Sequence, residues 1–239
     1  MKIEDVVIGL TVCWNTRELV ERSVNSIRKF HPQLSILIID GSSANDPCYA
    51  YLDSIANNIT HVYHAGKNIG HGRGMHLGIT KIQAPYILIF DSDIEMVKSP
   101  LQGMLDMMED DTFGVGYCER VGADGHDYGV FQRHQMQPSV KYMHPYFHLL
   151  QRKEYSKYKP YIHHGAPCIS TMLDIHKRGL SDKVLKEFAG LGHTNGCGMS
   201  WKPCKGEYVI HDVMGFGGTG KMRVAKGLPH IEGEWSKIV

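Results

Sequence analysis

Two carboxylates follow an apolar run near the middle of the chain. Residues 85–90 read PYILIF, which is typical of a buried strand, and Asp91, Ser92 and Asp93 come directly after it. In an extended chain, residues i and i+2 point to the same side, so both acids can face one ligand. Carboxylate oxygens suit Mg²⁺ or Mn²⁺, and such an ion can also hold a diphosphate. A short DxD motif also begins ordinary loops, so the surrounding sequence has to decide its role.

The segments before this motif alternate between strand and helix. Apolar runs rich in β-branched residues predict strands, which we place at residues 6–14, 34–40, 60–65 and 85–91. Helical spacing of apolar residues predicts helices, which we place after Thr16, at residues 47–57 and at residues 72–82. Strands joined by crossover helices imply an α/β fold with a mainly parallel central sheet flanked by helices.

The second half of the chain has weaker patterns. We expect helices at residues 100–110 and 177–191, and strands at residues 113–123 and 207–213. The C-terminal end is rich in glycine and is expected to be irregular. A chain of 239 residues favours one hydrophobic core, so we expect a single domain.

Four sequence blocks occur in the order found in a known family. They read TVCWNTRELVERSVNSI, ILIIDGSSAND, HAGKNIGHGRGMHLGI and YILIFDSDIEM, and they run from residue 11 to residue 96. In these blocks the chain resembles the family 2 glycosyltransferases of the GT-A fold. The resemblance implies a single GT-A domain over residues 1–239. Residues 1–100 would bind a nucleotide sugar, and residues 101–239 would bind the acceptor and carry a Gly-rich C-terminal lid.

The resemblance also implies a metal-dependent donor site. Asp91 and Asp93 would bind Mn²⁺ or Mg²⁺, and His211, which ends EYVIH, would complete the metal shell. Asp40 would hydrogen-bond the nucleobase or ribose of a nucleoside-diphosphate sugar, most simply a UDP-sugar, and Trp14 would lie near the base. The further donor-binding residues would be Asn15, Asn68, Gly70, Arg73, Ser92, Lys221 and Arg223. Family members often carry Arg-Asn before the last Gly of the third block, where this chain has Met75 and His76.

The acceptor side departs from the family. An acidic pair, one member of which acts as general base, is expected within LGHTNGCGMSWK, which contains His193 and no carboxylate. His193 can serve as the base, because a neutral imidazole titrates near neutral pH. An acid from elsewhere can replace it, and the candidates are Asp124, Asp127 and Asp174. A mechanism that retains the anomeric configuration would need no such base.

Two other motifs match their consensus only in part. Residues 215–221 fit GxxxxGK, but Met222 stands where a P-loop needs Ser or Thr, and Gly and Pro soon follow. A lid over the diphosphate suits this segment better. The ligand types of a zinc site occur at His193, Cys197, Cys204 and His211, with gaps that are not a usual finger spacing.

Residues 131–164 combine aromatic and basic side chains. The aromatic residues are Tyr142, Tyr146, Phe147, Tyr155, Tyr158 and Tyr161, and the basic residues are Arg133, Lys141, Arg152, Lys153, Lys157 and Lys159. This mixture suits stacking beside a polyanion. An acidic glycan, a lipid headgroup or a modified nucleic acid is therefore an expected acceptor, with a solvated basic face as the alternative.

The overall composition is ordinary for a globular protein. No apolar run approaches the roughly 18 residues that a membrane span needs. The N-terminus MKIEDVVIGLTVCW carries acids and no small-residue cleavage site, so it does not resemble a signal peptide. The six cysteines are scattered without a CxxC pair, and we expect reduced thiols and a cytoplasmic location.

The sequence therefore predicts a metal-dependent hexosyl- or pentosyltransferase that inverts the anomeric configuration. One rival is a nucleotidyltransferase, which would need an N-terminal Gly-rich loop that VVIGLTVCWNTRE lacks. A second rival is a non-catalytic module that binds polyanions. The missing acidic pair favours this module, whereas Asp40 and the intact Asp91–Asp93 motif oppose it.

Overall fold

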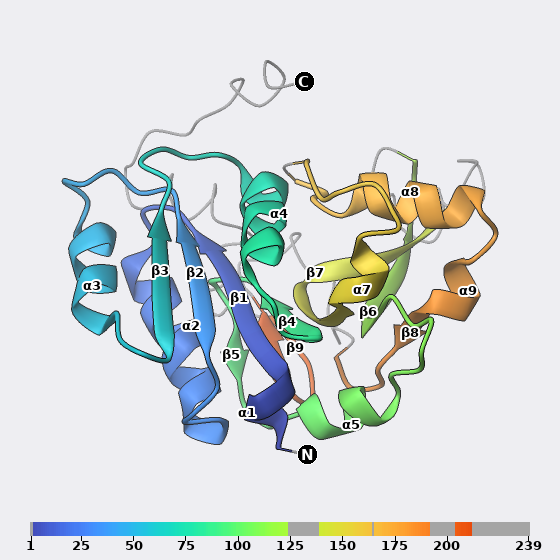
Figure 1. Ribbon diagram of the computed structural model, residues 1–239, viewed down its shortest axis with the longest axis horizontal. Helices are drawn as coiled ribbons and strands as arrows, with labels where there is room; N and C mark the ends of the chain where they lie inside the picture. Colours follow the sequence, from blue (N-terminus) through green and yellow to red (C-terminus); the bar gives the residue numbers. More distant parts are fainter. Residues whose placement is uncertain (1, 124–138, 164, 192–203, 212–239) are drawn as a thin grey trace.

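The computed structural model describes residues 2–123, 139–163, 165–191 and 204–211. Within these residues, a seven-stranded sheet has the order β3-β2-β1-β4-β7-β6-β8 (Figure 1). Its strands are β1 (Val7–Cys13), β2 (Ile36–Asp40), β3 (Thr60–His64), β4 (Tyr86–Phe90), β6 (Gly114–Val121), β7 (Val140–Gln151) and β8 (Leu185–Glu187). The four strands predicted in the first half are all present.

The central sheet is mainly parallel, as predicted. Strand β1 pairs in parallel with β2 and with β4, and β2 pairs in parallel with β3. Strand β7 is antiparallel to both of its neighbours, β4 and β6. The carboxyl ends of β1, β2, β3 and β4 therefore lie at one edge of the sheet, where α/β folds bind ligands.

Helices cover both faces of this sheet. The longer helices are α2 (Arg17–Phe30), α3 (Pro47–Ile55), α4 (His71–Lys81), α5 (Leu101–Asp106) and α8 (Ile169–Lys177). Shorter helices are α1 (Ile3–Val6), α7 (Arg152–Tyr155) and α9 (Ser181–Val184). One hydrophobic cluster joins the sheet to α4 and α8, and another joins it to α2, α3 and α5. Figure 1 shows α4 packed in front of β1 and β4.

Alternate residues of β1 face the two clusters. Leu10 packs in the cluster of α4, whereas Val7 and Cys13 pack in the cluster of α2 and α3. This alternation follows from the two-residue repeat of a strand. Helix α4 approaches β1 closely because it carries glycine at the contact: a β-carbon on Gly78 would lie 2.3 Å from Leu10 Cδ1.

A small antiparallel sheet brings the end of the described chain to the DxD motif. It has the order β5-β10-β9, in which the strands are β5 (Glu95–Met96), β9 (Cys204–Lys205) and β10 (Val209–His211). Strand β5 begins two residues after Asp93, and its pairing places Ile210 opposite Glu95. His211, the last residue of β10, therefore lies beside the carboxylates of Asp91 and Asp93. The strand predicted near residues 207–213 is present at this position.

One expectation for the second half is wrong. Residues 177–191 do not form one helix, because α8 ends at Lys177 and Gly179 then adopts a φ of 70°, in the left-handed region. Only α9 and the short strand β8 follow, and β8 pairs with β6 instead of continuing as helix.

Among the described residues, none of the helices has both the length and the apolar character that a transmembrane segment requires.

Candidate active site

A cavity of about 340 Å³ lies at the carboxyl edge of the central sheet. The ends of β1 and β4, the loop before α4, the start of β7 and the end of β10 all contribute to it. Its polar and aromatic lining residues include Trp14, Thr16, Asn68, His71, Asp91, Ser92, Asp93, His144 and His211. Both halves of the chain, as the sequence divided them, therefore contribute to one site.

Asp91, Asp93 and His211 come together in this cavity. One ligand atom from each lies within 4.8 Å of the others. Nε2 of His211 is 3.6 Å from a carboxylate oxygen of Asp91 and 3.6 Å from one of Asp93. Two carboxylates and an imidazole at these separations fit a divalent ion such as Mn²⁺. The three residues predicted as metal ligands therefore lie close enough together to hold one ion.

His71, the first residue of α4, is the closest cationic partner of Asp91. Its Nε2 lies 3.1 Å from Oδ1 of Asp91. Burial disfavours the charged form of His71, but the carboxylate of Asp91 outweighs it and raises the pKa of His71. Burial alone would raise the pKa of Asp91, but the facing His71, followed by His211 and His144, lowers it. Each member of this pair therefore favours the charged form of the other.

The ring of His211 is held by Tyr146 of β7. The two rings are stacked, with centroids 4.7 Å apart and an interplanar angle of 10°. Tyr146 is fully buried, and its hydroxyl donates a hydrogen bond to the backbone oxygen of Leu191. Because Tyr146 is fixed at both ends of its ring, it limits the orientations that His211 can adopt.

Four of the predicted donor-binding residues line the cavity. They are Trp14, Asn68, Gly70 and Ser92. Oδ1 of Asn68 accepts a hydrogen bond from the backbone N–H of Gly70 at 2.9 Å, which shapes the turn into α4. Gly70 has a φ of 85°, a conformation that glycine adopts without strain. The turn places the N-terminus of α4, whose dipole favours anions, at the cavity, although the backbone N–H of Gly72 is already donated to the backbone oxygen of His163 at 2.9 Å.

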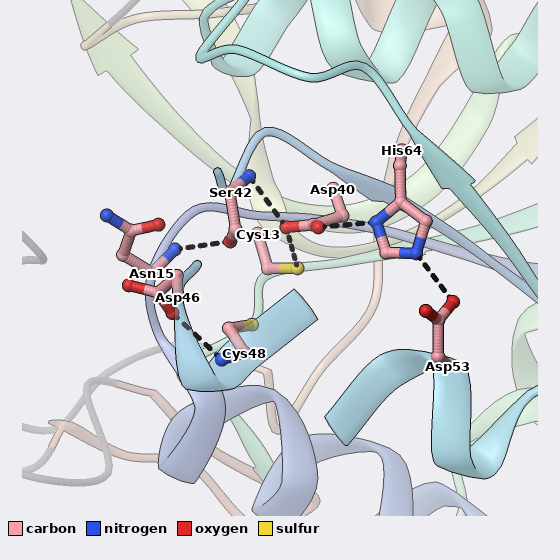
Figure 2. A network of polar contacts seen from close by, with 8 residues as sticks. All are labelled: Cys13, Asn15, Asp40, Ser42, Asp46, Cys48, Asp53 and His64. Carbon is pink, nitrogen blue, oxygen red and sulfur yellow. Dashed lines mark hydrogen bonds and ion pairs between the residues drawn. The ribbon is translucent and has the colours of Figure 1, made fainter. Parts of the chain in front are cut away.

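Three other predicted donor residues are not among those that line the cavity. Asp40 is fully buried; its Oδ1 accepts from Ser42 N at 2.9 Å, and its Oδ2 lies 2.8 Å from His64 Nδ1 (Figure 2). Asn15 donates its backbone N–H to Ser42 Oγ at 2.8 Å. Arg73 is exposed on α4. The structure gives Asp40 a protein partner at each carboxylate oxygen.

Asp174, an alternative to His193 as general base, is also outside the cavity lining. Its carboxylate lies 2.9 Å from Arg178 Nη2 and accepts the backbone N–H of Lys159 at 3.0 Å. Several other predicted residues lie outside the described part of the chain, namely His193, Lys221, Arg223, Asp124, Asp127, Cys197 and the Gly-rich segment 215–221.

Sequence reasoning missed two histidines of the cavity, His71 and His144. His144 lies on β7, and its Nε2 is 3.3 Å from Oε1 of Glu119. His71 directly follows the Asn68-Ile69-Gly70 loop, so its place at the start of a helix beside the sheet edge was a usable signal. His144 gave no such signal, because it was one of many polar residues in a segment with no clear period.

The stacking surface predicted in residues 131–164 is wrong. Tyr142, Tyr146, Phe147, Tyr155 and Tyr161 are buried core residues of β7 and its surroundings, with exposed fractions of 6% or less. Several of the basic residues are paired with acids, as in Lys141–Asp182, Lys153–Asp110 and Lys157–Glu154. These five rings are therefore not available to stack on a polyanionic acceptor.

Comparison with known proteins gives a family match over most of the chain. The profile of the family described as Glycosyl transferase family 2 matches residues 10–174. No curated protein sequence matches the chain.

Several solved structures share the fold at low sequence identity. A mannosyltransferase from Pyrobaculum calidifontis, in complex with GDP-Man and Mn²⁺, is 12% identical with a TM-score of 0.54, over 76% of this chain and 54% of that one. Glucosyl-3-phosphoglycerate synthase from Mycobacterium tuberculosis, in complex with UDP, is 12% identical with a TM-score of 0.55, over 80% and 73%. GalNAc-T7, with UDP, GalNAc and Mn²⁺, is 14% identical with a TM-score of 0.51, over 68% and 39%. The chain spans about half of the first protein and less of the third.

The His71–Asp91 pair makes a pH-dependent contribution to the stability of the metal-free protein. A lowered Asp pKa stabilises the fold above about pH 4, and a raised His pKa stabilises it below about pH 6.5 and is lost as the pH rises through the folded pKa. In a chelator, His71→Asn should lower the free energy of unfolding by about 1–2 kcal/mol at pH 5, and by less at pH 8.5. Urea denaturation at the two pH values measures this.

The exposed His61 on β3 provides the matched control. His61→Asn should change the stability by less than about 0.5 kcal/mol at both pH values. A cost of His71→Asn that is the same at pH 5 and pH 8.5 would show that the ion pair does not form.

Proposed function

We propose that this chain, which belongs to glycosyl transferase family 2, transfers a hexosyl or pentosyl group from a UDP-sugar to an acceptor hydroxyl. The transfer would invert the configuration at the anomeric carbon. The observation that carries the proposal is the convergence of Asp91, Asp93 and His211 in a cavity that the N-terminus of α4 also reaches. UDP is present in two of the similar structures and GDP-Man in a third. Both nucleotides therefore belong in the donor screen.

The proposed metal site consists of residues that the fold holds in place. A bound Mn²⁺ or Mg²⁺ would neutralise the charge that develops on the leaving diphosphate. Asp91 and Asp93 would supply hard oxygen ligands, and His211, stacked on Tyr146, would supply a nitrogen ligand. Mn²⁺ accepts an imidazole more readily than Mg²⁺ does, so Mn²⁺ is the better match. Mn²⁺ is also the ion in two of the similar complexes.

The proposed donor position follows from the same cavity. The diphosphate would lie between the metal ligands and the start of α4, where Asn68 and Gly70 shape the turn. The nucleoside would extend toward Trp14 at the end of β1. Asp40 takes no part in this arrangement, because it is fully buried and does not line the cavity.

Inversion requires a group that takes the proton of the acceptor hydroxyl. We keep His193 as the proposed base, and His144 is a second candidate because it lines the cavity and has Glu119 on one ring nitrogen. Replacing whichever histidine acts as the base should lower kcat by about 10²–10⁴-fold and remove the acidic limb of the pH–rate profile. His193→Gln and His144→Gln should differ in this effect. Equal and small losses in both would contradict a histidine base.

Asp91→Asn and Asp93→Asn should each lower Mn²⁺-dependent release of nucleoside diphosphate by at least about 100-fold, because each removes a charged metal ligand. The measurement is release of UDP or GDP from a panel of donors, with Mn²⁺, with Mg²⁺ and with a chelator. Asp110→Asn is the matched control, because the side chain of Asp110 is fully exposed, and it should retain wild-type turnover.

The same panel separates the rival functions. A nucleotidyltransferase would release pyrophosphate from a nucleoside triphosphate and a sugar phosphate, and would leave the nucleotide sugars intact. If the wild type releases no nucleoside diphosphate from any donor with either ion, the transferase proposal fails.

A further inference from the structure

Three residues of metal-ligating types meet on the opposite side of β1 from α4. Cys13 ends β1, Asp40 ends β2, and Cys48 lies in the first turn of α3 (Figure 2). Their exposed fractions are 3%, 0% and 0%. The two sulfur atoms and a carboxylate oxygen all lie within 4.8 Å of one another. This cluster is separate from Asp91, Asp93 and His211.

The regular structure holds the cluster in place. Cys13 and Asp40 are register partners in the parallel pairing of β1 with β2. Cys48 follows Pro47 at the start of α3, where Oδ1 of Asp46 caps the helix by accepting the backbone N–H of Cys48 at 2.8 Å. The ligand atoms are therefore presented by two strand ends and a capped helix, which are rigid elements and suit a preorganised site.

The side chains of the cluster form hydrogen bonds with one another. The thiol of Cys13 lies 3.6 Å from Oδ1 of Asp40 and also forms a hydrogen bond with Cys48, but it has only one proton to donate. The bond to Cys48, together with burial, raises the pKa of Cys13, whereas the bond from Cys13 lowers the pKa of Cys48. Two buried sulfur atoms and a buried carboxylate oxygen within 4.8 Å of one another form a set of ligand atoms that a cation would stabilise.

The distances suit a tetrahedral ion. Zinc binds thiolate sulfur at about 2.3 Å and carboxylate oxygen at about 2.0 Å, so two such ligands of one tetrahedral ion are about 3.5 Å apart. The observed separation between Cys13 Sγ and Asp40 Oδ1 is 3.6 Å. Two thiolates also select zinc over hard ions such as Mg²⁺.

A second layer of contacts orients Asp40. Nδ1 of His64 lies 2.8 Å from Oδ2 of Asp40, and Nε2 of the same ring lies 3.0 Å from Oδ1 of Asp53. The His64 ring is stacked on Tyr49 at a centroid distance of 3.7 Å. Figure 2 shows this chain of contacts running away from the two sulfur atoms. Metal-ligating carboxylates are characteristically held by such outer hydrogen bonds.

We propose that Cys13, Asp40 and Cys48 bind one Zn²⁺ ion, as a second metal site distinct from the one formed by Asp91, Asp93 and His211. The ion joins the ends of β1 and β2 to the start of α3. Because Cys13 also lines the cavity, a water molecule from the cavity takes the fourth position. Zinc here has a structural role at the edge of the cavity, and its binding does not depend on glycosyl transfer.

The test uses the reduced full-length chain after removal of metals. Titration with Co²⁺ should produce thiolate-to-metal charge-transfer absorption that saturates at one equivalent, and Zn²⁺ should displace it. Asp93→Asn should keep the absorption, because the other site contains no sulfur. Cys48→Ser should lose it, whereas Cys118→Ser, which alters a buried cysteine of β6, should keep it.

Two further variants test the site without removing a ligand. His64→Gln should weaken Zn²⁺ binding by about 10–100-fold, as expected for an outer contact of a metal ligand. His61→Gln, on an exposed residue of the same strand, should leave the affinity unchanged. Zn²⁺ should also protect Cys13 and Cys48 from alkylation and from oxidation to a disulfide by peroxide.

Measurements on the reduced wild-type protein test the zinc proposal even if the cysteine variants do not fold. The proposal fails if Co²⁺ produces no charge-transfer absorption in the wild type. It also fails if zinc leaves Cys13 and Cys48 as reactive as in the metal-free protein, or if His64→Gln and His61→Gln bind Zn²⁺ equally.

Discussion

The parallel pairing of β1 with β2 and β4 is the constraint on which the candidate sites depend. It brings three strand ends to one edge of the sheet, and each end carries residues with reactive side chains: Cys13, Asp40 and Asp91. The apolar core on both faces fixes the register, since a shift of one residue would exchange the two faces of every strand. The position of each carboxylate is therefore set by the packing of the core and not by the loops that follow.

A histidine faces each of the two aspartates at the strand ends. His64 meets Asp40, and His71 meets Asp91, at 2.8 Å and 3.1 Å. The two pairs differ in access: Asp40 is fully buried, whereas Asp91 lines the cavity beside Asp93. At the cavity, a metal and a diphosphate could replace His71 as the partners of Asp91. The Asp40–His64 pair places a carboxylate beside two sulfur atoms, so the two proposed sites, at strand ends on either side of β1, would suit different ions.

Local patterns were enough to predict the first half of the fold, and the resemblance to the family predicted that His211 would join Asp91 and Asp93. The strands there are apolar runs between clear turns, and the resemblance supplied the histidine. The burial of Asp40 could not be predicted, because its partners Cys13 and His64 come from neighbouring strands and Cys48 from the next helix. The aromatic residues of β7 were misread for a related reason. A strand buried on both faces has no two-residue alternation, so Tyr146 and Phe147 resembled a binding surface.

The central claim is that Asp91, Asp93 and His211 bind a divalent ion together with the diphosphate of the donor. Pulsed electron paramagnetic resonance of Mn²⁺ bound to the protein with UDP tests it directly. The account predicts nitrogen coupling from a coordinated imidazole, which His211→Ala removes, and phosphorus coupling from the diphosphate in the same complex. Bound Mn²⁺ that shows phosphorus coupling but no nitrogen coupling, or a spectrum that Asp93→Asn leaves unchanged, would contradict it.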